Sequence, residues 1–257
     1  MASGSKHDLN GLSLQRIRST LFNGLWAVWT TAFTPVILVI RLAGTPGSWV
    51  RAASRVWARG ILFGLKWVVG ITYTVEGAEN RPEGPCLIVA NHQSAWETIA
   101  FLALFPDVAI VTKQELLSVP IVSWFLRLSP MIIIDRDSGT KAIRKMMDEG
   151  AVALAQGRPV LIFPEGTRSD HLARIEFKRG VELLYARLGH PVLPVALNSG
   201  RYWSSDKKVM RAGEITVSYL PPIEAGMPPQ AAMKRAEHLI QEELDRIGGI
   251  EPQALAS

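Results

Sequence analysis

Short apolar runs rich in Val and Ile alternate with segments of helical periodicity after residue 70, and this alternation constrains the fold more than any other feature of the sequence. Such a pattern is typical of βα units, in which crossover helices cover a parallel sheet. We therefore predict an α/β fold with a largely parallel sheet flanked by helices. The expected strands are ITYTVEG, PCLIVAN, VAIVTK, MIIIDR, PVLIFPE, PVLPVALN and EITVSYL, and the expected helices cover 139–157, 177–189 and 231–249.

The amino-terminal part of the chain differs from the rest in charge. Residues 1–75 hold eight Lys or Arg and one acidic residue, whereas residues 76–257 hold 20 Lys or Arg and 22 acidic residues. Residues 25–40 carry no charge, but this run is shorter than the roughly 20 residues that span a bilayer, and Pro35 interrupts it. Residues 49–71 mix basic and aromatic side chains at helical spacing, a pattern that suits the boundary between lipid headgroups and acyl chains.

Five of the eight tryptophans precede residue 70, which indicates an interfacial role for this region. No small-residue cleavage site follows the apolar run, so we expect the segment to be retained. The predicted organisation is a membrane-associated helical hairpin over 1–70, an α/β domain over 71–249 and a tail over 250–257. A soluble hairpin packed on the α/β domain is the alternative, and the sequence leaves open whether residues 25–40 cross the bilayer.

The remaining composition excludes several classes of protein. One cysteine, Cys86, cannot form an internal disulfide, and a reducing compartment is the simpler assumption. No cluster with the spacing of metal ligands is present, so we expect no metal site. Nucleic-acid binding is also not expected, because the basic residues alternate with an apolar face and no nucleic-acid motif occurs. The histidines outside the segment described next are not expected to be catalytic, namely His7, His171, His190 and His238.

The segment NHQSAWET, residues 91–98, places a histidine and a carboxylate between two apolar runs. His92 follows an expected strand and Glu97 begins an expected helix. On one continuous helix the two side chains would point about 140° apart, but a turn between them lets them meet. A carboxylate bonded to one imidazole nitrogen leaves the other nitrogen as a base. By spacing alone, His92 could equally be an ordinary turn histidine, and Glu97 could be a residue that favours a helix start.

Three further polar groups follow expected strands. Arg136 ends the run MIIIDR, Lys113 ends VAIVTK, and the turn FPEGTR carries Glu165, Gly166, Thr167 and Arg168. A turn with Pro and Gly exposes backbone N–H groups, and its arginine suits an oxygen-rich anion. In sheets of this class ligands bind where strands end. The sequence therefore predicts a phosphate site beside an activated hydroxyl, and that hydroxyl is expected to come from the substrate because no G-x-S-x-G elbow is present.

These blocks resemble those of the glycerolipid acyltransferase family, specifically the 1-acylglycerol-3-phosphate acyltransferases. NHQSAWET, MIIIDR, FPEGTRS and VLPVAL occur in the order that the family shows, and the resemblance covers about residues 70–220. FPEGTRS is its most specific part. The chain departs from the family at Glu97, where an aspartate is usual.

The resemblance implies a role for each block. His92 would be the general base on the free hydroxyl of lysophosphatidic acid, and Glu97 would orient it. Phosphate binding would fall to Arg136 and Arg168, with Glu165, Gly166 and Thr167 shaping the turn, and with Lys113 and Lys178 as weaker additions. Pro194 and Val195 would shape the site or its acyl channel.

The resemblance also implies partners. The co-substrate would be acyl-coenzyme A or acyl-carrier protein, with no bound cofactor, and the product would be phosphatidic acid. The enzyme would act at the membrane, on the cytoplasmic face of the inner membrane. Alternatives are another acceptor, such as a lyso-ornithine lipid or a headgroup-bearing lysophospholipid, a lipid hydrolase, and a catalytically silent membrane scaffold. The sequence does not fix the donor or the chain length.

Overall fold

The structure of the protein is a computed structural model that describes residues 4–118, 120–129, 131–204 and 209–248. The side chains of residues 4–11, 120–122 and 136 lie outside the described part, as does the expected tail over 250–257. Within the described ranges, seven strands form one sheet in the order β1-β7-β6-β2-β5-β3-β4. They are β1 (Ile71–Glu76), β2 (Leu87–Ala90), β3 (Ala109–Lys113), β4 (Ile132–Ile134), β5 (Val160–Ile162), β6 (Val192–Leu197) and β7 (Gly213–Tyr219).

The sheet is parallel except at one pair of strands. Strands β6, β2, β5, β3 and β4 run in one direction, and β1 runs parallel to β7. The exception is β7, which meets β6 antiparallel. Each of the seven predicted runs contains one strand, so the predicted, largely parallel sheet is confirmed.

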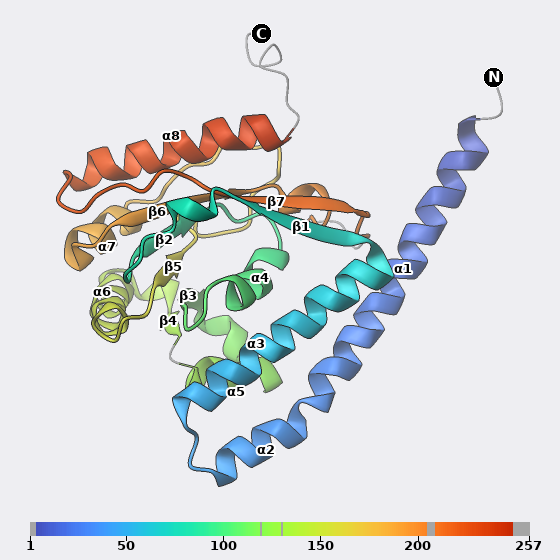
Figure 1. The fold of residues 1–257 in the computed structure, drawn as a ribbon, viewed down its shortest axis with the longest axis horizontal. Coiled ribbons are helices and arrows are strands. Elements are labelled where there is room, and N and C mark those ends of the chain that lie inside the picture. The colour runs from blue at the N-terminus through green and yellow to red at the C-terminus, as the bar shows by residue number, and fades with distance from the viewer. Residues whose placement is uncertain (1–3, 119, 130, 205–208, 249–257) are drawn as a thin grey trace.

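Helices cover both faces of the sheet (Figure 1). They are α1 (Gly4–Ala32), α2 (Thr34–Leu42), α3 (Gly47–Gly64), α4 (Trp96–Leu104), α5 (Pro120–Leu128), α6 (Thr140–Ala155), α7 (Gly180–Leu188) and α8 (Pro229–Gly248). A π-helical turn, Leu65–Val69, joins α3 to β1. The helices α6, α7 and α8 match the three expected from periodicity, whereas α5 has no counterpart among the predicted elements.

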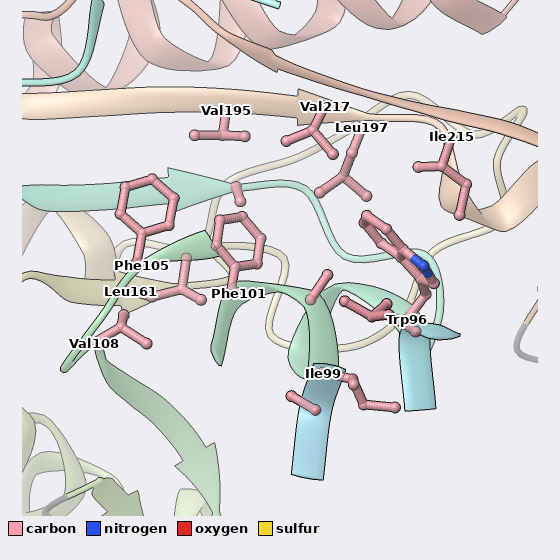
Figure 2. Packing of buried hydrophobic residues seen from close by; sticks show 14 of the residues in the cluster. Trp96, Ile99, Phe101, Phe105, Val108, Leu161, Val195, Leu197, Ile215 and Val217 are labelled. Atoms are coloured by element: carbon pink, nitrogen blue, oxygen red, sulfur yellow. The ribbon is translucent and has the colours of Figure 1, made fainter. Parts of the chain in front are cut away.

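Two apolar cores lie on the two faces of the sheet. One core packs α6, α7 and α8 against the sheet. The other packs α3 and α4 against the opposite face. Figure 2 shows this second core, where Trp96 and Phe101 of α4 face Val195 and Leu197 of β6. Because Trp96, Phe101 and Val195 are at most 1% exposed, the start of α4 is fixed on the sheet.

The amino-terminal helices form a hairpin beside the α/β part. α1 and α2 run outward, separated by a break next to Pro35, and α3 returns to the sheet (Figure 1). The indole N–H of Trp29 donates to the Trp57 carbonyl at 3.0 Å, which joins α1 to α3. By length and composition, Leu12–Leu42 is apolar enough to cross a membrane, and most of this segment is exposed.

Candidate active site

The carboxyl ends of the five mutually parallel strands share one edge of the sheet, and the predicted site residues follow these ends. His92 lies two residues beyond β2, and Glu97 lies in the first turn of α4. The turn between them brings the side chains together, with 2.9 Å between His92 Nδ1 and Glu97 Oε1. The imidazole is 18% exposed and the carboxylate is fully buried.

The Glu97 carboxylate accepts four more hydrogen bonds. Its Oε1 accepts the backbone N–H groups of Gln93 at 2.5 Å and Ser94 at 2.6 Å. Its Oε2 accepts the hydroxyls of Ser94 at 2.9 Å and Ser199 at 2.7 Å. Burial alone would raise the pKa of Glu97, but the hydrogen bond and charge of His92, together with the Ser94 and Ser199 bonds, hold it below its usual value. The carboxylate is therefore ionised and fixed.

Glu97 also stabilises the start of α4. A glutamate in the first helical turn that accepts the backbone N–H of a preceding serine has the geometry of one half of a capping box. Ser94 and Glu97 have this S-x-x-E spacing and this bond. The same carboxylate thus contacts both the helix start and His92, so the two sequence interpretations of Glu97 apply together.

Two polar contributors to this network were not foreseen from the sequence. Ser199 follows β6 and lies 102 residues from Glu97, and its hydroxyl is fully buried against the carboxylate. Gln93 is also buried, and its side-chain oxygen accepts the backbone N–H of Gly200 at 3.1 Å. Ser94 could have been found from the S-x-x-E signature, whereas Ser199 could not, because its position depends on β6 lying next to β2.

The surroundings of His92 fix its backbone and its ring. The ring stacks on Phe163, with 4.2 Å between ring centroids and 17° between ring planes. The backbone N–H of His92 donates to Glu165 Oε1 at 3.0 Å. Its carbonyl accepts the backbone N–H of Ser169 at 2.8 Å and the Ser169 hydroxyl at 3.1 Å. The FPEGTRS turn is therefore attached directly to the histidine.

Glu165 is a second buried carboxyl beside the first. It is 7% exposed, and its Oε2 has no hydrogen-bond partner among the described residues. The pKa of Glu165 is raised to about 7, mainly by burial; the hydrogen bond from His92 N–H opposes this shift, and the charge of Glu97 adds to it. The two carboxyls therefore differ in protonation, because Glu97 is ionised and Glu165 titrates near neutral pH.

The rest of the FPEGTRS turn faces solvent. Gly166 has φ +72°, and a Cβ there would lie 3.1 Å from Lys178 Nζ, so glycine lets the lysine pack on the turn. The side chains of Thr167, Arg168 and Lys178 are exposed. Within the described part of the chain, Arg168 and Lys178 form no ion pair with a carboxylate. Their charges are available to an anion.

The other predicted residues are placed as follows. Lys113 ends β3 with its side chain exposed. The backbone of Arg136 follows β4 at the same edge, but its side chain lies outside the described part. Pro194 and Val195 are buried inside β6, upstream of the strand end. The structure therefore brings His92, Glu97 and Glu165 into contact, and it places the cationic residues at the same edge of the sheet.

An apolar cavity of about 100 Å³ lies beside α4, the helix that carries Glu97. Thr98 and Ile99, which directly follow Glu97, line it, together with residues of α3, β3 and α5 that include Trp57, Ile110 and Phe125. Pro194 and Val195 do not line it. Its apolar lining suits a hydrocarbon chain.

The arrangement can deprotonate a hydroxyl. Because Glu97 accepts from Nδ1, the proton of the neutral imidazole is assigned to Nδ1, and Nε2 is left to accept another proton. The apolar cavity is lined in part by β3, the strand that ends in Lys113. Among the described residues, no group of three or more His, Cys, Asp or Glu could hold a metal ion.

Comparisons with known proteins identify the family. A family model described as Acyltransferase matches residues 72–198. The 1-acyl-sn-glycerol-3-phosphate acyltransferase of Pseudomonas aeruginosa is 36% identical over 249 residues, which cover 93% of this chain and 95% of that protein. The human 1-acyl-sn-glycerol-3-phosphate acyltransferase beta is 30% identical over 61% of this chain and 57% of its own length.

A solved structure shows the same fold. The crystal structure of the 1-acyl-sn-glycerophosphate (LPA) acyltransferase, PlsC, from Thermotoga maritima matches with a TM-score of 0.75 at 20% identity and covers 94% of this chain and 97% of that one. This likeness supports the fold, and the Pseudomonas relative supports the family over nearly the full length of both proteins. The chain belongs to the acyltransferase family.

Proposed function

We propose that the protein is a 1-acylglycerol-3-phosphate O-acyltransferase, which transfers an acyl chain from a thioester to the free sn-2 hydroxyl of lysophosphatidic acid and yields phosphatidic acid. The observation that carries the proposal is the contact of His92 with a buried, ionised Glu97, at a sheet edge that also carries the exposed side chains of Lys113 and Arg168. The name of the Pseudomonas relative, which covers nearly the whole chain, describes this acceptor.

In the proposed mechanism, His92 Nε2 takes the proton of the substrate hydroxyl as its oxygen attacks the thioester carbonyl. The tetrahedral intermediate collapses, the carbon–sulfur bond breaks, and the thiolate leaves. His92 then returns the proton to the thiolate, so no net proton is gained or lost. Glu97 keeps the Nδ1 proton in place and stabilises the imidazolium that forms in between.

The substrates would occupy the two environments next to the base. The acceptor phosphate would bind Arg168 and Lys178, with Lys113 and Arg136 at neighbouring strand ends and Thr167 in the turn. The acyl chain of the donor would fill the apolar cavity that Thr98 and Ile99 line. Acyl-coenzyme A and acyl-carrier protein both provide such a thioester.

We also propose that the enzyme works on the cytoplasmic face of a membrane, with the amino-terminal helices lying along the bilayer surface. Phe22 and Trp26 of α1 pack on Trp203, while Phe33, eleven residues beyond Phe22, packs on Phe125 of α5. A helix held to the α/β part over this length lies beside that part. The exposed apolar side chains of α1–α3 and of the π-helical turn are available for lipid and include Leu21, Leu25, Val28, Leu38, Val39, Trp49, Phe63 and Trp67.

A substrate panel tests the function. Purified protein would be given lysophosphatidic acid, headgroup-bearing lysophospholipids or a lyso-ornithine lipid, each with acyl-coenzyme A or acyl-carrier protein, and products would be identified by mass. We expect phosphatidic acid as the main product. His92→Ala should lower kcat/KM about a thousandfold, since a general base contributes about 10² to 10⁴. His238→Ala is the matched control, because His238 is exposed on α8 and should be dispensable.

Two outcomes would overturn the proposal. The absence of any diacyl product with either donor would exclude acyl transfer to a lysolipid. Release of free fatty acid without acylated product would indicate a hydrolase. If the enzyme prefers a lyso-ornithine lipid over lysophosphatidic acid in competition, the proposed acceptor is wrong and the proposed acyl transfer still holds.

A further inference from the structure

A second, polar cavity of about 130 Å³ lies beside the segment that carries His92, apart from the apolar one. Its lining includes His171, Arg201, Tyr202 and Arg211, and Gly200 is part of its wall. Arg201 and Arg211 belong to the connection between β6 and β7, and His171 belongs to the loop that follows the FPEGTRS turn. None of these residues has a role in the mechanism above.

Strand order places this cavity on one side of the base and the acceptor-binding cations on the other. His92 follows β2, and β6 is the neighbour of β2 on one side. On the other side lie β5, β3 and β4, whose ends carry Arg168, Lys113 and Arg136 (Figure 1). The catalytic base therefore lies between two sets of cationic residues.

The cavity wall contacts the catalytic segment directly. The backbone N–H of Gly200 donates to Gln93 Oε1 at 3.1 Å, and Gln93 is the residue after His92. A Cβ added at Gly200 would lie 2.9 Å from Gln93 Cβ and 3.1 Å from His171 Cβ. Only glycine fits between these two side chains, so the cavity adjoins the residue next to the base.

The cavity walls are held by contacts beyond the cavity itself. The Arg211 N–H donates to the Tyr202 carbonyl at 2.8 Å, and the Met210 N–H donates to the Ser19 hydroxyl at 2.9 Å. Trp203 packs edge-on against Trp26 of α1, with 5.7 Å between ring centroids. The backbone segments that carry Arg201 and Arg211 are therefore held in place before a ligand binds.

The charge of the cavity favours an anion. Arg201 and Arg211 are exposed, and neither forms an ion pair within the described ranges 4–118, 120–129, 131–204 and 209–248. His171 Nδ1 is buried without a hydrogen bond among described residues, and its nearest carboxylate oxygen, Asp170 Oδ1, is 3.4 Å away. Two arginines and an imidazole donor outnumber this one carboxylate, and arginine suits phosphate oxygens.

We propose that this cavity binds a phosphate group of a substrate, at a site separate from that of Arg168 and Lys178. The inference rests on the proposed function and deepens it. Two kinds of phosphate meet at such an enzyme: the monoester of the acceptor and the phosphate attached to the pantetheine arm that carries the thioester. The acceptor already has cations on the β5 side, so the β6–β7 side is assigned to the pantetheine phosphate of the donor, with the thioester between the two sites.

Kinetics with paired donors test the assignment. Arg201→Gln, Arg211→Gln and the double variant would be compared with Arg235→Gln, which removes an exposed charge from α8. We expect the double variant to raise the KM for acyl-coenzyme A about tenfold or more. The KM for acyl-pantetheine, which lacks the phosphate, and that for lysophosphatidic acid should stay unchanged. A rise in the KM for lysophosphatidic acid with both donors would show that the cavity binds the acceptor phosphate, which would overturn the assignment to the donor. Unchanged KM values for all substrates would overturn the phosphate site itself.

A binding measurement separates this inference from the proposed function. Titration of free coenzyme A by calorimetry needs no turnover, with pantetheine as the ligand that lacks phosphate. We expect the double variant to weaken coenzyme A binding about tenfold and to leave pantetheine unaffected. If the double variant binds coenzyme A more weakly but the wild type forms no diacyl product, the phosphate site is supported and the proposed function is wrong. Unchanged binding in an active enzyme would defeat the site alone.

Discussion

Glu97 and Asp107 are hydrogen-bonded carboxylates near opposite edges of the same sheet, and their surroundings differ. Glu97 lies at the carboxyl edge, is fully buried, and accepts two backbone N–H groups, two hydroxyls and one imidazole nitrogen. Asp107 precedes β3 at the amino edge and is 44% exposed. It pairs with Arg51 Nε at 2.7 Å and Arg55 Nη1 at 3.1 Å.

The difference shows which carboxylate is arranged for chemistry. Apart from His92, every donor to Glu97 is neutral, so the negative charge is held without a permanent counter-ion and can stabilise a protonated imidazole. Both charged partners of Asp107 belong to α3, so this carboxylate joins the amino-terminal hairpin to the α/β part. Burial with neutral donors leaves Glu97 able to stabilise a charged imidazole, as the proposed mechanism requires, whereas the arginine pairs of Asp107 connect two parts of the fold.

The largest expected effect is that of Glu97→Gln. Because two backbone N–H groups donate to Oε1, the amide oxygen should take that place, so the variant keeps the proton on Nδ1 but loses the negative charge that stabilises the imidazolium. We expect kcat/KM to fall about a thousandfold with normal KM values, measured with the best donor and acceptor of the panel. Glu97→Asp should recover most of the loss if the shorter carboxylate still reaches the ring. A Gln variant with more than a tenth of wild-type activity would remove Glu97 from the mechanism.

The second largest effect is expected at Glu165, which is buried like Glu97 but has a pKa of about 7. Its pKa is raised to about 7 in the folded protein, above that of an unfolded glutamate, so its contribution to stability is full below about pH 4.5 and is lost as the pH rises through about 7. Glu165→Gln keeps an acceptor for the His92 N–H and does not titrate. We expect the wild type to lose about 3 kcal/mol of unfolding free energy relative to this variant between pH 4.5 and pH 7.5.

Urea unfolding of both proteins in detergent at several pH values would measure this difference. Glu176→Gln is a control, because Glu176 is exposed. A difference between wild type and Glu165→Gln that does not change with pH would show that Glu165 has an ordinary pKa.

These regions also show which features could be predicted from the sequence. The strands followed from Val- and Ile-rich runs, and the contact of His92 with Glu97 followed from a turn between a strand and a helix. Both features are local in the chain. The Ser199 and Asp107 contacts were not predicted, because they join residues 102 and more than 50 positions apart.

Such contacts depend on strand order and on the packing of helices, which periodicity does not encode. The antiparallel direction of β7 beside β6 could not be predicted either, since parallel and antiparallel strands share the same apolar pattern. The cavity at the β6–β7 connection is its direct consequence, because the chain must reverse there.

A smaller effect is expected at Asp107, at the amino edge of the sheet. Asp107 has φ +64°, which asparagine tolerates, so Asp107→Asn removes the charge without straining the backbone. Loss of two partly exposed ion pairs should lower the unfolding free energy by about 1 kcal/mol and leave kcat unchanged. The difference should shrink in 1 M salt. Asp148→Asn is the control, since its ion pairs on α6 are exposed and longer. A large fall in kcat would mean that α3 also positions the catalytic residues.

The smallest expected effect distinguishes a positioning role for Ser199 from a packing role. Ser199→Ala removes one of five hydrogen bonds to Glu97 and leaves the other four, so we expect kcat/KM to fall only about fivefold. Because the lost donor helps to hold the pKa of Glu97 low, the variant carboxylate is easier to protonate, and the acid limb of the pH profile should move to higher pH. Ser118→Ala, on an exposed serine, is the control. A fall in activity without movement of the acid limb would mean that Ser199 only fills space. The neutral donors around Glu97 would then hold the carboxylate in position without lowering its pKa.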